Sequence, residues 1–311
     1  MKISFILPIY NESGNIKELY SRIINTINNL SCEYELVFIN DASKDNSLDL
    51  LIELSNSDKN VKTLNFSRNF GHQIAITAGL DYANGDIVVI MDTDLQDPPE
   101  IIPEMLAKYN EGYKVIYAKR RTRKDSFFKK ITAKMFYRIL RKLSNIDIPL
   151  DTGDFRMMDR DVVEQMKKIR EHSRFMRGIT SWIGFKQTFV EFDRDERKYG
   201  VTNYPLSKML KFALDGITSF SYKPLKIATY TGFMTSFFAF VYALYIVISY
   251  FFLGKVYEIG WPTIILAIMF FGGLQLIILG IIGEYIGRIY TETQNRPLYI
   301  ISDIYNNGKN N

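Results

Sequence analysis

The chain has 311 residues, of which 47% are hydrophobic and 23% charged, and its formal net charge is +5. This provides the material for one domain of about 200 residues with a large core, plus an appendage. The single cysteine, Cys32, excludes an internal disulfide and suits a reducing compartment.

The positive charge is concentrated in one segment. Residues 119–142 hold eleven Lys and Arg residues against Asp125 alone, so this segment carries +10 and the remainder of the chain −5. A local patch indicates an anionic partner surface and not general basicity, and no nucleic-acid partner is expected.

Apolar runs and helical periodicity alternate along the first 118 residues. The expected strands are at 3–7, 34–39, 61–66, 87–91 and 114–118, and the expected helices at 13–30, 48–54, 72–83 and 100–110. This alternation predicts an α/β fold with a doubly wound, mostly parallel sheet. The apolar run at the N-terminus is too short for a secretory signal, so this part is expected in the cytosol.

Polar residues follow each of the first four strands, at 10–12, 40–41, 68–69 and 92–94. Because parallel strands end at one edge of a sheet, these residues are expected to meet there. No GxGxxG follows the first strand, which argues against a dinucleotide site.

Asp92 and Asp94 are the most informative of these polar residues. Alternate residues leaving a strand tend to point the same way, and a hard divalent cation would relieve the repulsion between the two carboxylates while binding a diphosphate. A polar loop with an Asx-turn and a helix cap before Pro98 is the alternative.

The C-terminal third contains two long segments without charge, 227–253 and 261–283. Each exceeds the 20 or so apolar residues that span a bilayer, so two transmembrane helices joined by a tight turn are predicted. Basic residues flank the pair and place both ends in the cytoplasm: Lys223, Lys226, Arg288 and Arg296. The predicted location is therefore the inner (cytoplasmic) membrane, as a multi-pass protein whose first domain faces the cytosol.

Residues 206–220 have the periodicity of an amphipathic helix, which suits either the membrane interface or an ordinary soluble surface. Residues 127–143 show the same ambiguity. The predicted domains are a cytosolic catalytic domain at 1–205, a juxtamembrane helix at 206–224, a transmembrane hairpin at 225–287 and a cytosolic tail at 288–311.

Six motifs resemble those of family 2 glycosyltransferases, and in particular the polyisoprenyl-phosphate glycosyltransferases. They are PIYNE at 8–12, NDAS at 40–43, SRNFGHQ at 67–73, MDTDLQDPPE at 91–100, DTGDFRMMDR at 151–160 and RKYGVTNYPL at 197–206. The resemblance implies a GT-A-type fold for the first domain.

The resemblance also implies roles for single residues. Those expected to bind the donor nucleotide are Pro8, Tyr10, Glu12, Asp41, Arg68 and Asp92. Those expected to hold Mg²⁺ or Mn²⁺ are Asp92, Asp94 and Gln96, whose oxygens suit either ion. His72 is expected to pack or to form hydrogen bonds and not to bind metal.

Asp94 and Asp154 are the expected catalytic residues, and Asp154 matches the candidate base of the family. A phosphate monoester has a second pKa near ~6, so a lipid phosphate needs little deprotonation, and Asp154 could orient the acceptor or organise cations instead. Basic residues are expected to bind the acceptor phosphate, namely Arg120, Arg121, Arg123, Arg197 and Lys198.

The expected reaction is inverting transfer of a sugar from a UDP-sugar to polyprenyl phosphate, with glucose as first choice and N-acetylglucosamine, galactose, aminoarabinose or mannose as alternatives. A processive polysaccharide synthase is disfavoured because such enzymes usually carry more spans and a Q/RxxRW motif, where this chain has RKYGVTNY. Expected partners are the two substrates, the lipid bilayer and a possible second copy of the chain.

Overall fold

The computed structural model describes residues 1–30, 32–121, 152–193, 223–253, 260–306 and 309–310. Three predicted acceptor-site residues, Arg123, Arg197 and Lys198, lie outside the described residues. So do the basic segment 127–143 and the proposed juxtamembrane helix at 206–220.

One nine-stranded sheet organises the N-terminal domain, in the order β7-β5-β6-β4-β1-β2-β3-β8-β9. The strands are β1 (Lys2–Ile9), β2 (Glu33–Asn40), β3 (Val61–Phe66), β4 (Ile87–Ile90), β5 (Val115–Arg120), β6 (Thr152–Asp159), β7 (Gln187–Phe192), β8 (Ile301–Asn306) and β9 (Lys309–Asn310). The first four are mutually parallel, as the strand–helix alternation predicts.

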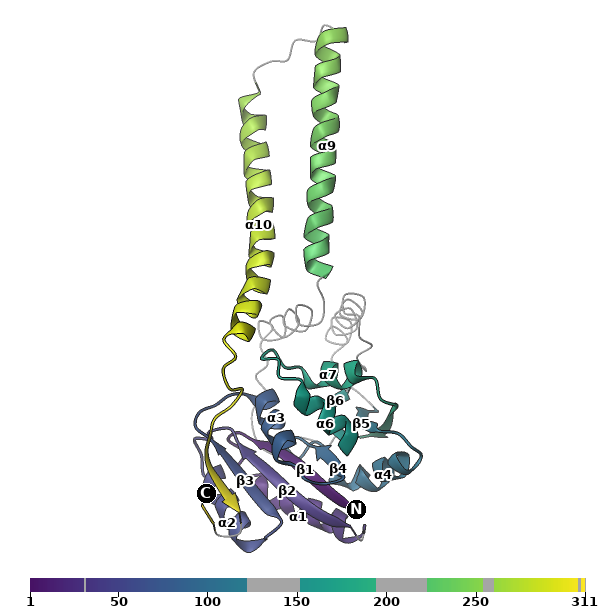
Figure 1. Cartoon of the computed structure of the whole chain (residues 1–311), viewed down its shortest axis with the longest axis vertical. Helices are drawn as coiled ribbons and strands as arrows, with labels where there is room; N and C mark the ends of the chain where they lie inside the picture. Colours follow the sequence, from purple (N-terminus) through teal and green to yellow (C-terminus); the bar gives the residue numbers. More distant parts are fainter. Residues whose placement is uncertain (31, 122–151, 194–222, 254–259, 307–308, 311) are drawn as a thin grey trace.

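Helices cover both faces of this sheet (Figure 1). They are α1 (Ile16–Asn28), α2 (Ser47–Ser57), α3 (His72–Tyr82), the 3₁₀ turn η1 (Pro99–Ile101) with α4 (Ile102–Asn110), α6 (Arg160–Lys168) and α7 (Met176–Ile183). The predicted doubly wound α/β fold is confirmed, with mixed strand directions toward its two edges.

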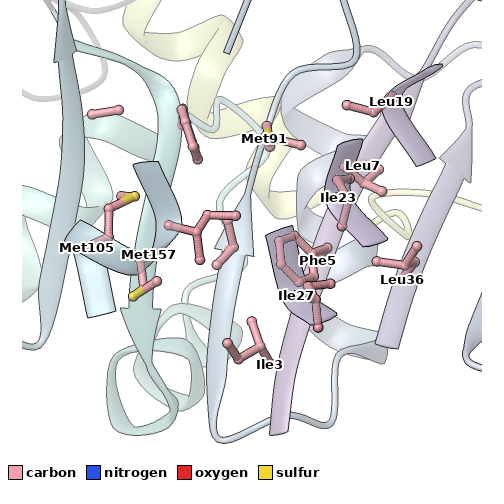
Figure 2. Close-up of a cluster of buried hydrophobic side chains, with 14 of the residues drawn as sticks. Ile3, Phe5, Leu7, Leu19, Ile23, Ile27, Leu36, Met91, Met105 and Met157 are labelled. Atoms are coloured by element: carbon pink, nitrogen blue, oxygen red, sulfur yellow. The ribbon is translucent and has the colours of Figure 1, made fainter. Parts of the chain in front are cut away.

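Two apolar clusters follow from strict alternation along the central strands. In β1, Ile3, Phe5 and Leu7 face one cluster while Ile6 faces the other. Figure 2 shows the first cluster, in which these three side chains pack against α1 through Leu19, Ile23 and Ile27. The second cluster lies beneath α3, α6 and α7.

The strand β6 is absent from the sequence prediction. It lies between β4 and β5 and runs antiparallel to both. Its sequence, TGDFRMMD, places the buried charges Asp154 and Arg156 among apolar residues, so it lacks the apolar run that marked the other strands.

The end of the chain also differs from the expected tail. After α10 it returns to the sheet as β8, antiparallel to β3. The Tyr299 ring stacks on Phe66 with centroids 5.4 Å apart, and its hydroxyl donates to Asp81 Oδ2 at 2.8 Å. These contacts join residues 299–306 to the N-terminal domain, a long-range pairing that the local sequence did not reveal.

Two long helices project away from the sheet side by side, α9 (Lys223–Leu253) and α10 (Trp261–Thr293) (Figure 1). Within α10, the 27 residues Ala267–Thr293 are long and apolar enough to cross a membrane, with a mean hydropathy of 1.9 and no buried residue in the most apolar stretch. Both helices lie where the sequence predicts them, and membrane crossing by α9 and α10 stays a prediction.

Gly79 lets α3 approach the sheet closely. A Cβ atom at this position would lie 2.3 Å from Ile6 Cγ2 and 3.0 Å from Ile39 Cδ1. Contacts below 3 Å are not tolerated in a packed interior, so only glycine fits without movement of the helix.

We therefore expect Gly79→Ala to destabilise the protein by about 1–3 kcal/mol, because overpacking outweighs the higher helix propensity of alanine. Chemical denaturation would measure this. Adding Ile6→Ala removes the side chain that clashes with the new Cβ atom. The double variant should therefore lose less stability than the sum of the losses in the two single variants. Strict additivity would contradict the packing argument.

Candidate active site

The sheet brings two acidic segments together at the edge where β1 to β4 end. Because β6 runs antiparallel to β4, its first residues lie beside the last residues of β4, with Ile90 paired to Arg156. Continuing this register by two residues sets Asp92 opposite Asp154. The antiparallel strand thus supplies the juxtaposition of two carboxylates that are 62 positions apart in the sequence.

Asp154 is the centre of a dense ionic cluster. Its carboxylate accepts hydrogen bonds from Gln73 Nε2 at 2.9 Å and from Arg177 Nε at 3.1 Å. His72 Nε2 lies 3.3 Å from the same group and an Arg156 terminal nitrogen 3.6 Å away. Burial would raise the pKa of Asp154, but Arg177, His72 and Arg156 together hold that pKa well below its usual range. The carboxylate is therefore ionised at neutral pH.

His72 begins α3 and bridges the two acidic segments. Its Nε2 lies 3.4 Å from Asp92 Oδ1 as well as 3.3 Å from Asp154 Oδ2. Burial would lower the pKa of His72, but the hydrogen bond to Asp154 and the charges of Asp92 and Asp154 raise it to about 9. These contacts agree with the expectation that His72 packs or forms hydrogen bonds. Sequence analysis did not predict that His72 lies between the two acidic segments of the site.

Arg156 fixes β6 against α7 from within the core. Its guanidinium donates to Thr180 Oγ1 at 2.8 Å and to the carbonyl oxygens of Gly153 and Asp154 at 3.1 and 3.2 Å. Burial lowers its pKa to about 10, so it stays charged. Arg156 lies in the motif DTGDFRMMDR but was given no role by sequence analysis, and Arg177 lies outside the six motifs.

The loop after β4 adds a third buried carboxyl group, Asp97. Its Oδ2 accepts the backbone N–H of Asp92 at 3.4 Å, and only 2% of the residue is exposed. Burial first, and then the charges of Asp92 and Asp94, raise the pKa of Asp97 to about 8. Sequence analysis gave this residue no role in the site, although it lies in the motif MDTDLQDPPE.

Asp94 forms the Asx-turn that the sequence offered as an alternative, since its Oδ1 accepts the backbone N–H of Gln96 at 3.1 Å. Leu95 between them has a φ of 61°, and Asn11 and Ala42 in the loops after β1 and β2 have φ of 55°. Left-handed backbone at non-glycine residues costs free energy and is concentrated at functional sites. Here it occurs in three loops of one edge.

The acidic residues fit a divalent cation only in part. Asp92 Oδ1 is buried without a hydrogen-bond partner, and burial raises the pKa of Asp92 against the positive charge of His72. Within the described ranges, no three His, Cys, Asp or Glu side chains are arranged to hold a metal ion. Magnesium is commonly bound by one or two carboxylates together with substrate phosphates, and these residues fit that mode.

The residues expected to enclose the nucleotide line the same edge. Tyr10 is 43% exposed, whereas Pro8 is buried and its carbonyl accepts from Thr93 Oγ1 at 2.9 Å. Glu12 accepts from Asn15 Nδ2 at 2.5 Å, and the Arg68 guanidinium lies 4.1 Å from the centroid of the Phe70 ring.

Asp41 has a structural task at this edge. Its two oxygens accept the backbone N–H groups of Phe70 and Gly71 at 2.7 and 2.9 Å. It is 3% exposed, and burial raises its pKa. Asp41 thus shapes the loop that presents Arg68 and leads into His72.

Arg120 and Arg121, the two predicted acceptor-site arginines that the structure describes, contact different neighbours. Arg120 lies near the site, because its guanidinium lowers the pKa of Asp97 and is 3.5 Å from the position of a Cβ on Gly153. Arg121 instead forms an exposed ion pair with Asp193 at 3.1 Å. Of this pair, only Arg120 is directed at the acidic loop in the structure.

Comparison with known proteins gives a consistent result along the chain. Residues 4–167 match the family described as Glycosyl transferase family 2, and residues 223–289 match the GtrB C-terminal hairpin. The uncharacterized glycosyltransferase YkcC of Bacillus subtilis is 52% identical over 98% of this chain and 94% of its own. The prophage bactoprenol glucosyl transferase homolog of Escherichia coli is 43% identical over 98% and 99%. The bactoprenol glucosyl transferase of Shigella phage SfII is 43% identical over 97% of both chains.

Arg177→Gln should destabilise the protein by about 2 kcal/mol at pH 7, because it removes a charged hydrogen bond to a buried carboxylate. The depressed pKa of Asp154 contributes stability above the pKa of an unfolded aspartate, and this contribution is lost as the pH falls through the folded value. The difference between variant and wild type should therefore shrink below about pH 4. Denaturant titrations at several pH values would measure it.

Arg121→Gln is the matched control, because its ion pair with Asp193 is exposed on both sides and should contribute less than about 0.5 kcal/mol. Equal effects of the two substitutions would show that Arg177 does not stabilise Asp154.

Proposed function

Because the chain belongs to glycosyl transferase family 2, we propose that it transfers glucose from UDP-glucose to polyprenyl phosphate with inversion at the anomeric carbon. The products are polyprenyl-phosphate-glucose and UDP. Two relatives that are 43% identical over nearly their full length carry the name bactoprenol glucosyl transferase or its homolog, which supports both the sugar and the acceptor.

The observation that carries the proposal is the meeting of Asp92 and Asp154 through His72 at the edge where the parallel strands end. A carboxylate-lined loop suits the donor diphosphate, and an ionic cluster directly beside it suits a second phosphate. Both substrates of the proposed reaction are anionic, so a site for them needs positively charged side chains. His72 supplies one such charge between the carboxylates of Asp92 and Asp154.

For the donor, we propose that Pro8, Tyr10, Glu12, Asp41 and Arg68 surround the nucleotide, with Asp41 acting through the loop that it holds. Asp92, Asp94 and Gln96 would hold Mg²⁺ or Mn²⁺ together with the diphosphate. When bound, the ion would neutralise negative charge on the departing UDP. Asp97 lies beside these residues, and burial first and then the charges of Asp92 and Asp94 raise its pKa.

For the acceptor, we propose that Asp154 organises cations and does not remove a proton. Its oxygens already accept from Gln73 and Arg177, and its depressed pKa makes it a weak base. A phosphate with a second pKa near ~6 is mostly dianionic at neutral pH and can attack without deprotonation. Asp154 then keeps His72 and Arg177 at the edge of the sheet, where they can offset the charge of the incoming phosphate.

Arg120, Arg121, Arg123, Arg197 and Lys198 remain the proposed contacts for the acceptor phosphate, with Arg120 best supported by its approach to Asp97. The apolar helices α9 and α10 would anchor the enzyme in the cytoplasmic membrane with the catalytic domain in the cytosol. A bound enzyme then meets its lipid substrate at the headgroup level. A homo-oligomer stays a prediction.

Transfer of radiolabel from UDP-glucose into an organic-extractable lipid tests the proposed function directly. The full chain in vesicles with polyprenyl phosphate should form labelled lipid with UDP-glucose at a rate at least about tenfold above that with other sugar nucleotides. A higher rate with UDP-N-acetylglucosamine, UDP-galactose or a GDP-sugar would correct the sugar, and no lipid product with any donor would refute the reaction.

Asp94→Asn should reduce transfer by at least about 100-fold, because it removes a proposed ligand from a polar loop outside the core. In calorimetry, Mg²⁺ should strengthen UDP binding to wild type and have little effect on the variant. Asp49→Asn, an exposed carboxylate in the first turn of α2, is the control and should behave as wild type. Full turnover of wild type in EDTA would exclude the metal.

A further inference from the structure

A cavity of about 490 Å³ lies between α10 and the segment that joins α6 to α7. Its walls include Glu171 and Ser173 from that segment and Tyr285, Arg288 and Ile289 from α10. Figure 1 shows the end of α10 descending to the catalytic domain at this level. The cavity is separate from the acidic edge of the sheet described above.

A membrane crossed by α10, as the sequence predicts, would place the cavity at its headgroup layer. The uncharged part of α10 ends at Gly283, and charged residues then recur every fourth position at Glu284, Arg288 and Glu292. Since Ala267–Thr293 is apolar enough to span a bilayer, this charged end marks the interface. Any molecule filling the cavity would meet both lipid tails and water.

Glu171 is the unsatisfied group of the cavity. Its Oε1 is buried without a hydrogen-bond partner, and no ion pair joins its carboxylate to any residue that the structure describes. The nearby Arg174 donates to the carbonyls of Ile169 and Met166 through its terminal nitrogens, and its buried Nε has no hydrogen-bond partner within the described part of the chain. Burial raises the pKa of Glu171 against the opposing charge of Arg174. A half-buried carboxylate with one buried, unsatisfied oxygen favours a cationic hydrogen-bond donor.

The other acidic residue of the cavity wall already has partners. Glu292 accepts from the backbone N–H of His172 at 2.7 Å, and its second oxygen lies 3.0 Å from His172 Nδ1. This contact fixes the α6–α7 segment against α10, so the cavity has a rigid wall. It leaves Glu171 as the carboxylate available to a ligand.

Arg288 supplies positive charge on the opposite wall. Its guanidinium donates to Ser173 Oγ at 3.1 Å and pairs with Glu284, and its side chain is 18% exposed. A guanidinium beside a hydroxyl is a suitable site for a phosphate oxygen. Tyr285 and Ile289 provide apolar surface next to it.

We propose that this cavity binds the headgroup of an ethanolamine phospholipid, with the ammonium group at Glu171 and the phosphate at Arg288 and Ser173. The glycerol backbone and the first methylenes of the lipid lie against Tyr285 and Ile289. A primary ammonium is positively charged and donates three hydrogen bonds, so it satisfies the buried Oε1 of Glu171. A trimethylammonium has the charge but no N–H donor, and a glycerol headgroup has hydroxyl donors but no positive charge. Lipid binding there stabilises the joint between α10 and the catalytic domain.

Native mass spectrometry of the full chain in detergent tests this site, with dioleoyl lipids that carry ethanolamine, choline or glycerol headgroups. Wild type should bind one phosphatidylethanolamine at least about tenfold more tightly than either of the other lipids. Glu171→Gln should abolish this preference, while Arg288→Gln should weaken binding of all three lipids because each carries the phosphate.

Asp49→Asn is the control, since this exposed carboxylate in the first turn of α2 lies outside the cavity wall and should leave the preference unchanged. UDP binding to each variant would verify that the catalytic domain is folded, and this readout does not depend on the cavity. Equal binding of the three lipids to wild type, or an unchanged ethanolamine preference in Glu171→Gln, would overturn the proposal.

Discussion

The constraint on which the site depends is the burial of one charged carboxylate, Asp154, at the start of an antiparallel strand. A buried ion of this kind persists only with good partners, and it has them in Arg177 from α7, Gln73 and His72 from α3, and Arg156 from its own strand. Three elements from different parts of the chain are thereby fixed at one point. The same contacts keep positive charge next to the acidic loop after β4.

The acidic loop shows the opposite electrostatic condition. Asp92, Asp94 and Asp97 are close together, and the pKa values of Asp92 and Asp97 are raised because burial and mutual repulsion are not fully offset by His72 at Asp92 and by Arg120 at Asp97. On one side of the site, the carboxylate of Asp154 is thus surrounded by an excess of positive charge. On the other side, Asp92, Asp94 and Asp97 carry more negative charge than the neighbouring cations offset. This asymmetry supports a donor diphosphate with its ion on one side and an acceptor phosphate on the other.

The sequence predicted the parts of the fold that have a strong local signal. Apolar runs located β1 to β5, and the DTD motif located the acidic edge, because both depend on neighbouring residues. The strand β6 was missed because it carries buried charges that only long-range partners stabilise, and β8 was missed because its pairing with β3 joins residues about 240 positions apart. For the same reason His72, Arg177 and Asp97 entered the site only once the sheet order was known. Of the predicted acceptor residues, Arg120 lies beside Gly153 at the start of β6, and its charge lowers the pKa of Asp97, whereas Arg121 pairs with Asp193.

The central claim is that Asp154 acts as a permanent charge that positions cations and not as a base. The most direct measurement is the ratio of the transfer rates with Asn and with Asp at position 154 between pH 5 and 8, both in a His72→Gln background, because Asp154 itself raises the pKa of His72. Titration of the acceptor phosphate affects both enzymes and cancels in this ratio. We expect a constant ratio below one, because Asp154 is ionised throughout this range. A ratio that rises toward one as the pH falls would show that Asp154 titrates as a base, and would contradict the account.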